Sequence, residues 1–188
     1  MNVNAAARAL LARAAHAAVP DTVLFARLIG ARMEAGDVSL LGLNKPELDA
    51  LTTRHFTQTI DGDHTPPWTP HRVFVHDLHA LLMRHDVTLT HSPDDAHCLA
   101  MIIATACLRP DHLWRDLGLD GRADVSAMLE RHYPALAALA ALAARNVDEM
   151  RWKKFLAYEV ASANGVAPTC APGCPGCEDY RFCYPFRQ

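Results

Sequence analysis

The spacing of apolar residues along the chain predicts a series of short helices and no strand of useful length. Residues 4–17 form one amphipathic stretch, and a second follows Pro20 and ends at Gly36. A third helix is expected to begin after Asn44, with Asn44 as its N-cap and Pro46 in its first turn. The fourth spans residues 72–85, with its expected buried side formed by Val73, Phe74, Leu78, Leu81 and Leu82.

The second half of the chain carries the stronger helix signals. Ser92 and Pro93 begin an almost wholly apolar segment that ends near Leu108, and this composition predicts the central helix of a bundle. A short helix closed by Gly118 follows, and then one that Asp124 is expected to cap. The pattern predicts a single long helix over residues 134–163.

We therefore predict an all-α fold, a helical bundle followed by an irregular cysteine-rich tail that binds metal. Residues 1–168 form the helical domain and residues 169–188 the tail. Within the first part, residues 55–72 contain three prolines and two turn signals, which predict an irregular loop.

Composition narrows the classes of function. The chain has 188 residues, of which 51% are hydrophobic, enough for a real core. Its net charge of −3 gives no basic field that would attract nucleic acid. The most apolar run, residues 134–144, is too short to span a membrane. The expected location is the cytoplasm, where cysteines stay reduced and are available for metal.

The tail carries the most informative chemistry. Four of the six cysteines lie in it at the spacing C-x3-C-x2-C-x5-C: Cys170, Cys174, Cys177 and Cys183. Prolines and glycines between them predict a loop with fixed turns, without helix or central strand. Gly173 and Gly176 each stand next to a cysteine, where a positive φ would let backbone N–H groups approach a sulfur.

Three kinds of bonding remain open for these cysteines. Structural zinc is usually held by two cysteine pairs a dozen or more residues apart, whereas iron–sulfur clusters often use one clustered run. Disulfides are the least favoured, because such short loops strain the bridge. The first three cysteines also share the C-x3-C-x2-C spacing of radical S-adenosylmethionine enzymes. Those motifs follow an early strand in a long α/β chain, so this interpretation is rejected.

Other candidate groups have weaker signals. Arg151, Lys153 and Lys154 precede the tail and could attract an oxyanion such as molybdate, or the negative charge of a cluster, although a solvated helix face is the plainer interpretation. His76 and His79 share a helix face and are expected to be solvated. The remaining cysteines, Cys98 and Cys107, are nine residues apart on one helix, so they are expected to point to opposite sides as core residues.

Three motifs in order give the chain a family resemblance. His112-Leu-Trp-Arg-Asp-Leu-Gly-Leu119, then Met150-Arg-Trp-Lys-Lys-Phe155, then the four-cysteine tail, resemble the NifQ family of nitrogen-fixation proteins. The resemblance covers roughly residues 70–188, and residues 1–69 carry little of it.

The resemblance implies a metal carrier and donor, not an enzyme. NifQ proteins are expected to carry an iron–sulfur cluster containing molybdenum, with molybdate as the metal source. They donate molybdenum for biosynthesis of the nitrogenase iron–molybdenum cofactor. The implied partners are the cofactor-assembly scaffold and the nitrogenase iron protein; neither nucleic acid nor membrane is expected.

Carried onto this chain, the resemblance implies Cys170, Cys174, Cys177 and Cys183 as cluster ligands. Its pattern has four residues between the first two cysteines where this chain has three, so Cys170 is the ligand most in question. His112 is a candidate additional ligand or proton donor. The alternative function is a small zinc-stabilised helical adaptor for protein–protein interaction. A redox enzyme is disfavoured, because the chain has no nucleotide-binding glycine loop.

Overall fold

The computed structural model describes residues 4–57, 59–60, 69–146 and 150–185. Over these ranges it contains ten α-helices, three 3-10 helices and no strand. The predicted all-α class is confirmed. Within the same ranges, no helix combines the length and the apolar character needed to cross a membrane.

The α-helices follow one another along the chain. They are α1 (Ala5–Leu11), α2 (Pro20–Ala35), α3 (Lys45–Phe56), α4 (Arg72–His85), α5 (Pro93–Ala106), α6 (Leu113–Asp116), α7 (Arg122–His132), α8 (Pro134–Asn146), α9 (Trp152–Ala163) and α10 (Tyr180–Cys183). The 3-10 helices are η1 (Val38–Leu41), η2 (Thr69–His71) and η3 (Cys174–Gly176).

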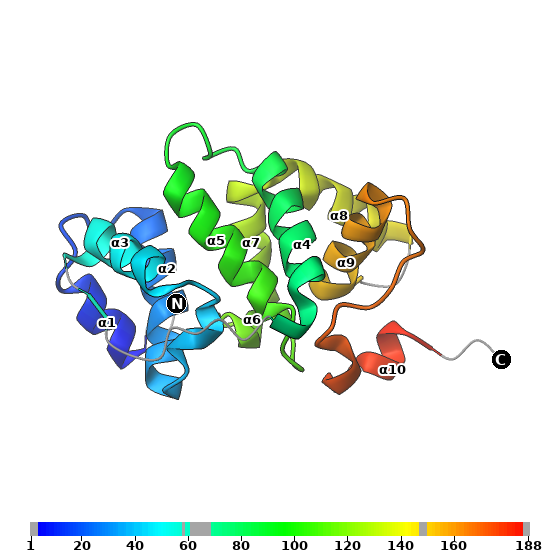
Figure 1. Ribbon diagram of the computed structural model, residues 1–188, viewed down its shortest axis with the longest axis horizontal. Coiled ribbons are helices and arrows are strands. Elements are labelled where there is room, and N and C mark those ends of the chain that lie inside the picture. Colours follow the sequence, from blue (N-terminus) through cyan, green and yellow to red (C-terminus); the bar gives the residue numbers. More distant parts are fainter. Residues whose placement is uncertain (1–3, 58, 61–68, 147–149, 186–188) are drawn as a thin grey trace.

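Helix α5 lies at the centre, as its apolar composition predicts. Figure 1 shows α1, α2 and α3 at one end of the molecule, and α8, α9 and the tail at the other. Helix α5 packs against α4 and α3, while α4 also packs against α9. Nine of its residues are buried. The tail therefore stands at the end of the bundle formed by the second half of the chain.

Several sequence predictions about helix ends are wrong in detail. The long helix expected over residues 134–163 is two helices, α8 and α9, because Arg151 is extended (ψ 144°) and α9 begins after it. Asp124 lies in the first turn of α7 and Gly121 takes the cap position. The first helix is shorter than expected and ends at Leu11. Val73 is 75% exposed, and Val75 takes the buried position on α4.

The predicted irregular segment lies partly outside the described residues. Helix α3 ends at Phe56, and Thr57 closes it in the left-handed conformation (φ 52°). Residues 61–68 are outside the described part, and α4 begins at Arg72.

The tail contains more helix than its prolines and glycines suggested. Residues 178–183 lack both residue types, and the backbone N–H of Cys183 donates to the carbonyl of Asp179 at 2.9 Å, which closes one helical turn. This turn, α10, separates the last two cysteines, and η3 begins at Cys174. The tail thus keeps the irregular course that the sequence predicts, with two short helical turns that its prolines and glycines did not indicate.

Candidate metal centre

Three of the four tail cysteines line one cavity. Cys174, Cys177 and Cys183 border a hollow of about 290 Å³ that is closed on its other sides by α6, α7, α8 and the start of α9. Cys174 is buried, and the other two are partly exposed. The short helical turns η3 and α10 bring these three cysteines close together, because each turn shortens the path of the chain between them.

Cys170 lies near this group without lining the hollow. It is partly buried, and it interacts electrostatically with Cys174 and with the side chain of Tyr180. The structure therefore distinguishes Cys170 from the other three cysteines. The sequence does the same, because the spacing between Cys170 and Cys174 is one residue shorter than in the family pattern.

The two cysteines of α5 are core residues on opposite sides, as predicted. Cys98 lies towards Arg54 and Cys107 towards Lys153. Burial raises the pKa of each thiol to about 12, so both stay protonated at neutral pH. Cys107 lies directly beneath the tail, because its carbonyl accepts a hydrogen bond from the N–H of Gly173 at 3.1 Å.

The glycines of the tail are needed for close approach to the bundle. A Cβ placed on Gly173 would lie 2.0 Å from the carbonyl oxygen of Arg109, and one on Gly176 would lie 2.5 Å from Cβ of Pro110. Gly173 has φ −79°, which any residue can adopt. The expectation of a positive φ at Gly173 was therefore wrong, and the requirement there is steric: the loop presses against the segment that follows α5.

Gly173→Ala is expected to detach the tail while leaving the bundle folded. The new methyl group would meet backbone atoms that cannot rotate away, and overpacking of this kind costs about 1–3 kcal/mol. Limited trypsin digestion should then cut the tail at Arg181 faster than in the wild type, with unchanged far-UV circular dichroism. Gly121→Ala is the control, because Gly121 is extended (φ 177°) and a Cβ there meets no atom within 4 Å. Equal digestion of both variants would contradict the close approach.

Lys153 is part of the scaffold under the site. Its ammonium is buried and bonds to the carboxylate of Asp116 and, at 2.7 Å, to the carbonyl of Arg109. Arg109 approaches the same carboxylate, with Nε 3.5 Å from Oδ1. Burial lowers the pKa of Arg109 to about 10. These contacts tie α9 to α6 and to the end of α5, so Lys153 does not face solvent as a surface residue would.

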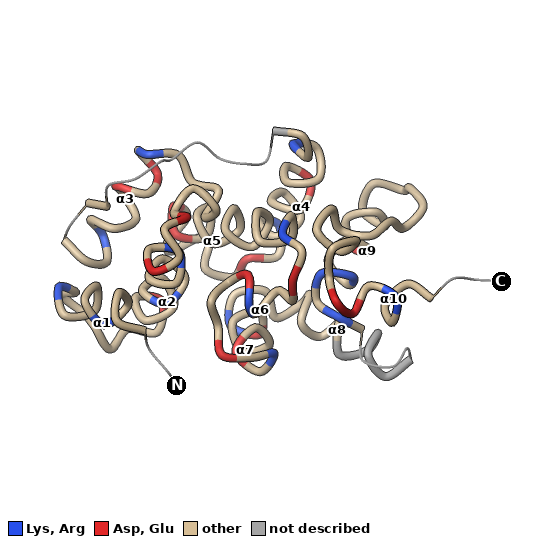
Figure 2. The backbone as a smooth tube through the Cα atoms, turned by 90° about the horizontal axis from the view of Figure 1, so that it is seen from below, with Lys and Arg blue, Asp and Glu red and all other residues tan. Residues whose placement is uncertain are grey.

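The other two predicted basic residues contact the tail itself. Arg151 Nη2 lies 2.8 Å from Asp179 Oδ2, and Lys154 Nζ donates to the carbonyl of Cys183 at 2.5 Å. Figure 2 shows basic and acidic positions close together where the tail meets the neighbouring helices. The interpretation as a solvated helix face does not describe them, because all three basic residues make specific contacts around the cysteines.

These cations also act on the thiols. Burial raises the pKa of Cys174 to about 11, and the charge of Lys153 opposes that shift. Burial also raises the pKa of Cys183, where Arg151 and Lys154 act in the opposite direction. Metal ligation requires thiolates, so cations held at these positions favour the ligating form of the cysteines.

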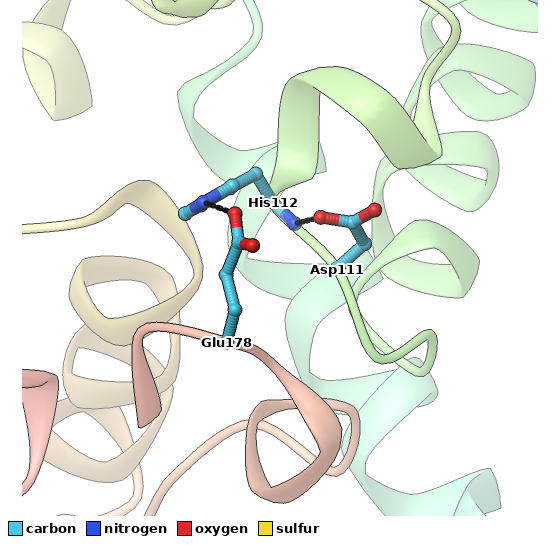
Figure 3. Close-up of side chains that lie close together, drawn as sticks. All are labelled: Asp111, His112 and Glu178. Atoms are coloured by element: carbon cyan, nitrogen blue, oxygen red, sulfur yellow. Dashed lines mark hydrogen bonds and ion pairs between the residues drawn. The ribbon is translucent and has the colours of Figure 1, made fainter. Parts of the chain in front are cut away.

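His112 is held against the tail by a carboxylate. Its Nε2 lies 3.2 Å from Oε1 of Glu178, while its backbone N–H donates to Asp111 at 2.7 Å (Figure 3). Three possible ligand atoms of these residues lie within 4.8 Å of one another. Arg115 pairs with both carboxylates at 3.1 and 3.0 Å, so the cluster is first of all a salt-bridge network between α6 and the tail. His112 also lines the cysteine cavity.

The histidines of α4 have different surroundings. His76 is exposed, as expected of a solvated face. His79 is partly buried and its Nε2 lies 3.0 Å from Nδ1 of His97, which in turn lies 3.2 Å from Glu47. Neither histidine lines the cysteine cavity.

Sequence reasoning missed several residues of the site. Glu178 and Asp179, between the third and fourth cysteines, attach the tail to His112 and Arg151. Tyr180 and Tyr184 also line the cavity. The face of α7 formed by Arg122, Ser126 and Glu130 also lines the cavity, and its four-residue spacing could have indicated it.

Comparison with known proteins agrees with this arrangement of motifs. The family model described as NifQ matches residues 23–185. The chain belongs to the NifQ family. The match includes all four tail cysteines, His112 and the basic residues of α9. NifQ membership places the chain among nitrogen-fixation proteins.

Curated NifQ proteins are similar over part of their length. A "Protein NifQ homolog" of Sinorhizobium fredii is 40% identical over 108 residues, which are 57% of this chain and 43% of the relative. "Protein NifQ" of Azotobacter vinelandii is 40% identical over 86 residues, 46% of this chain and 41% of the relative. "Protein NifQ" of Rhodobacter capsulatus is 34% identical over 90 residues, which are 48% of this chain and 47% of the relative. The chain thus matches less than half of each of these relatives, and no solved structure matches it.

Proposed function

We propose that this NifQ chain binds an iron–sulfur cluster containing molybdenum at its tail and donates the molybdenum for biosynthesis of the nitrogenase iron–molybdenum cofactor. The observation that carries the proposal is the placement of Cys174, Cys177 and Cys183 around one cavity with cations beside them. The chain acts as a carrier of this cargo, with molybdate as the metal source, in the reducing cytoplasm.

The donor set suits a cluster that must later leave. Three cysteine thiolates can hold three corners of a cubane, which leaves one corner for a different metal or an exchangeable ligand. Molybdenum accepts sulfide and thiolate, and a site with an open corner can release it. The tail is at the end of the bundle, where a partner can reach it. The proposed recipients are the cofactor-assembly scaffold and the nitrogenase iron protein.

The two candidate guests differ in the sulfur spacing that they require. Tetrahedral zinc at about 2.3 Å from each sulfur requires sulfurs about 3.8 Å apart. Among the described residues, the one group of three or more possible ligand atoms within 4.8 Å of one another is Asp111, His112 and Glu178, and no cysteine belongs to it. The zinc-stabilised adaptor is the alternative that the experiment must separate.

Anaerobic purification followed by elemental analysis tests the proposal. Molybdenum, iron, zinc and acid-labile sulfide are measured in the wild type and in a Cys174→Ala, Cys177→Ala variant. We expect iron, sulfide and molybdenum in the wild type and their joint loss in the variant, whose circular dichroism should stay helical. One equivalent of zinc without sulfide would overturn the carrier and support the adaptor.

A transfer assay tests the second half of the proposal. The loaded chain is mixed with purified cofactor-assembly scaffold, with and without the nitrogenase iron protein, and the two proteins are separated before metal analysis. Molybdenum should move to the scaffold and leave this chain. Retention of all molybdenum by the loaded chain would make it a store instead of a donor.

A further inference from the structure

Tyr184 follows the last cysteine and has a fixed position beside the cavity. Its ring centroid lies 5.3 Å from that of Tyr180, and Nζ of Lys154 lies 5.0 Å from its own ring centroid. Lys154 is itself bonded to the carbonyl of Cys183. A ring held by a neighbouring ring on one side and a cation on another has little freedom to swing away.

The hydroxyl of Tyr184 is buried among sulfurs. It is shielded from solvent, and it has no hydrogen-bond partner among the described residues. Tyr184 lines the same cavity as Cys174, Cys177 and Cys183. A buried O–H group without an acceptor is unusual and marks a place where an acceptor is expected.

We propose that the hydroxyl of Tyr184 donates a hydrogen bond to a sulfur of the loaded site, a cysteine thiolate or a cluster sulfide. Protonated thiols are poor acceptors, whereas thiolate and sulfide carry negative charge and accept readily. The tyrosine is thus a positioning residue for the cargo. This inference rests on the proposed function and adds to it a control over how firmly the cargo is held.

The consequence follows from the charge on the sulfurs. One-electron reduction makes the sulfurs more negative and strengthens a hydrogen bond to them, so the donor raises the reduction potential. The same bond stabilises the loaded chain relative to the empty one. Loss of the hydroxyl should therefore lower the potential and speed the loss of metal.

The roles of the two tail tyrosines differ. The Tyr180 side chain interacts with Cys170, which does not line the cavity, and its hydroxyl is not among the buried polar groups that lack a partner. Tyr184 has a buried hydroxyl without a partner on the described chain. Of the two tyrosines, Tyr184 is therefore the one whose hydroxyl is available to donate a hydrogen bond to the bound cluster.

The test compares Tyr184→Phe with the wild type after anaerobic loading with iron and sulfide. We expect a more negative reduction potential on titration with dithionite and a several-fold faster loss of iron to a chelator. The empty variant should unfold in denaturant at the same or a higher concentration than the empty wild type, because an unpaired buried hydroxyl has been removed. A merely structural tyrosine would instead lower the stability of the empty chain.

Tyr158→Phe is the matched control. Tyr158 also packs against Lys154, 5.6 Å from ring centroid to Nζ, but it does not line the cavity. Its potential and iron loss should equal those of the wild type. An unchanged potential and iron loss in Tyr184→Phe would overturn this inference alone, whereas a wild type that takes up no iron and sulfide would overturn the proposed function with it.

Discussion

Asp116→Ala is expected to destabilise the folded chain by about 3–5 kcal/mol, the cost of leaving a buried charge without its partner. Lys153 is 5% exposed and has the Asp116 carboxylate as its only anionic partner among the described side chains. The same carboxylate lies 3.5 Å from Nε of Arg109. Removing it leaves two cations close together in a poorly hydrated place. Denaturant unfolding followed by far-UV circular dichroism measures the loss.

Two further variants separate the charge from the packing. Asp116→Leu combined with Lys153→Met removes the carboxylate and the ammonium and keeps apolar volume, so it should recover the part of the lost stability that is due to Lys153, while Arg109 stays without Asp116. Asp49→Ala breaks the half-exposed i,i+4 pair of Lys45 and Asp49 on α3, where Nζ and Oδ1 lie 2.5 Å apart, and should cost only about 0.3–0.5 kcal/mol. If Asp116→Ala cost no more than Asp49→Ala, the buried pair would not be holding α6 and α9 together.

Helix type and order were predictable because local patterns determine them. The proline and cap at Ser92 and Pro93 and the apolar run that follows correctly predict the central helix α5. Gly36 and Gly118 adopt positive φ at the ends where the sequence predicts a stop. The division between α8 and α9 was not predictable in this way, because alanine-rich sequence favours helix on both sides of it.

The sequence predicts the cysteines of the candidate site, but it does not predict the residues that hold those cysteines in place. Spacing alone indicates that four thiols act together, whereas the separation of Cys170 from the other three depends on the turns of η3 and α10. Lys153 reads as a surface residue in the sequence, and it becomes a buried one only because α6 supplies Asp116 from 37 residues away. Contacts of that kind depend on tertiary packing, which no local pattern records.

Single replacement of Cys174, Cys177 or Cys183 by serine is expected to abolish binding of the cluster, whereas Cys170→Ser should retain it. The first three thiols line the cavity, whereas Cys170 lies outside its lining and interacts with Tyr180. Changing a residue that only supports a metal ligand typically costs 10–100-fold in affinity, so loss of a ligand itself should cost more than about 100-fold. Iron and sulfide per chain after anaerobic reconstitution measure the result.

The controls decide between a three-cysteine and a four-cysteine site. Cys98→Ala removes a buried thiol from the far side of α5 and should leave iron and sulfide at the wild-type level. Loss of the cluster in Cys170→Ser, with Cys98→Ala unaffected, would show that all four tail cysteines are ligands. A cubane with four protein ligands has no open corner for molybdenum, so that outcome would count against direct donation from the tail. Retention in Cys170→Ser leaves the open corner through which a carrier can pass on its metal.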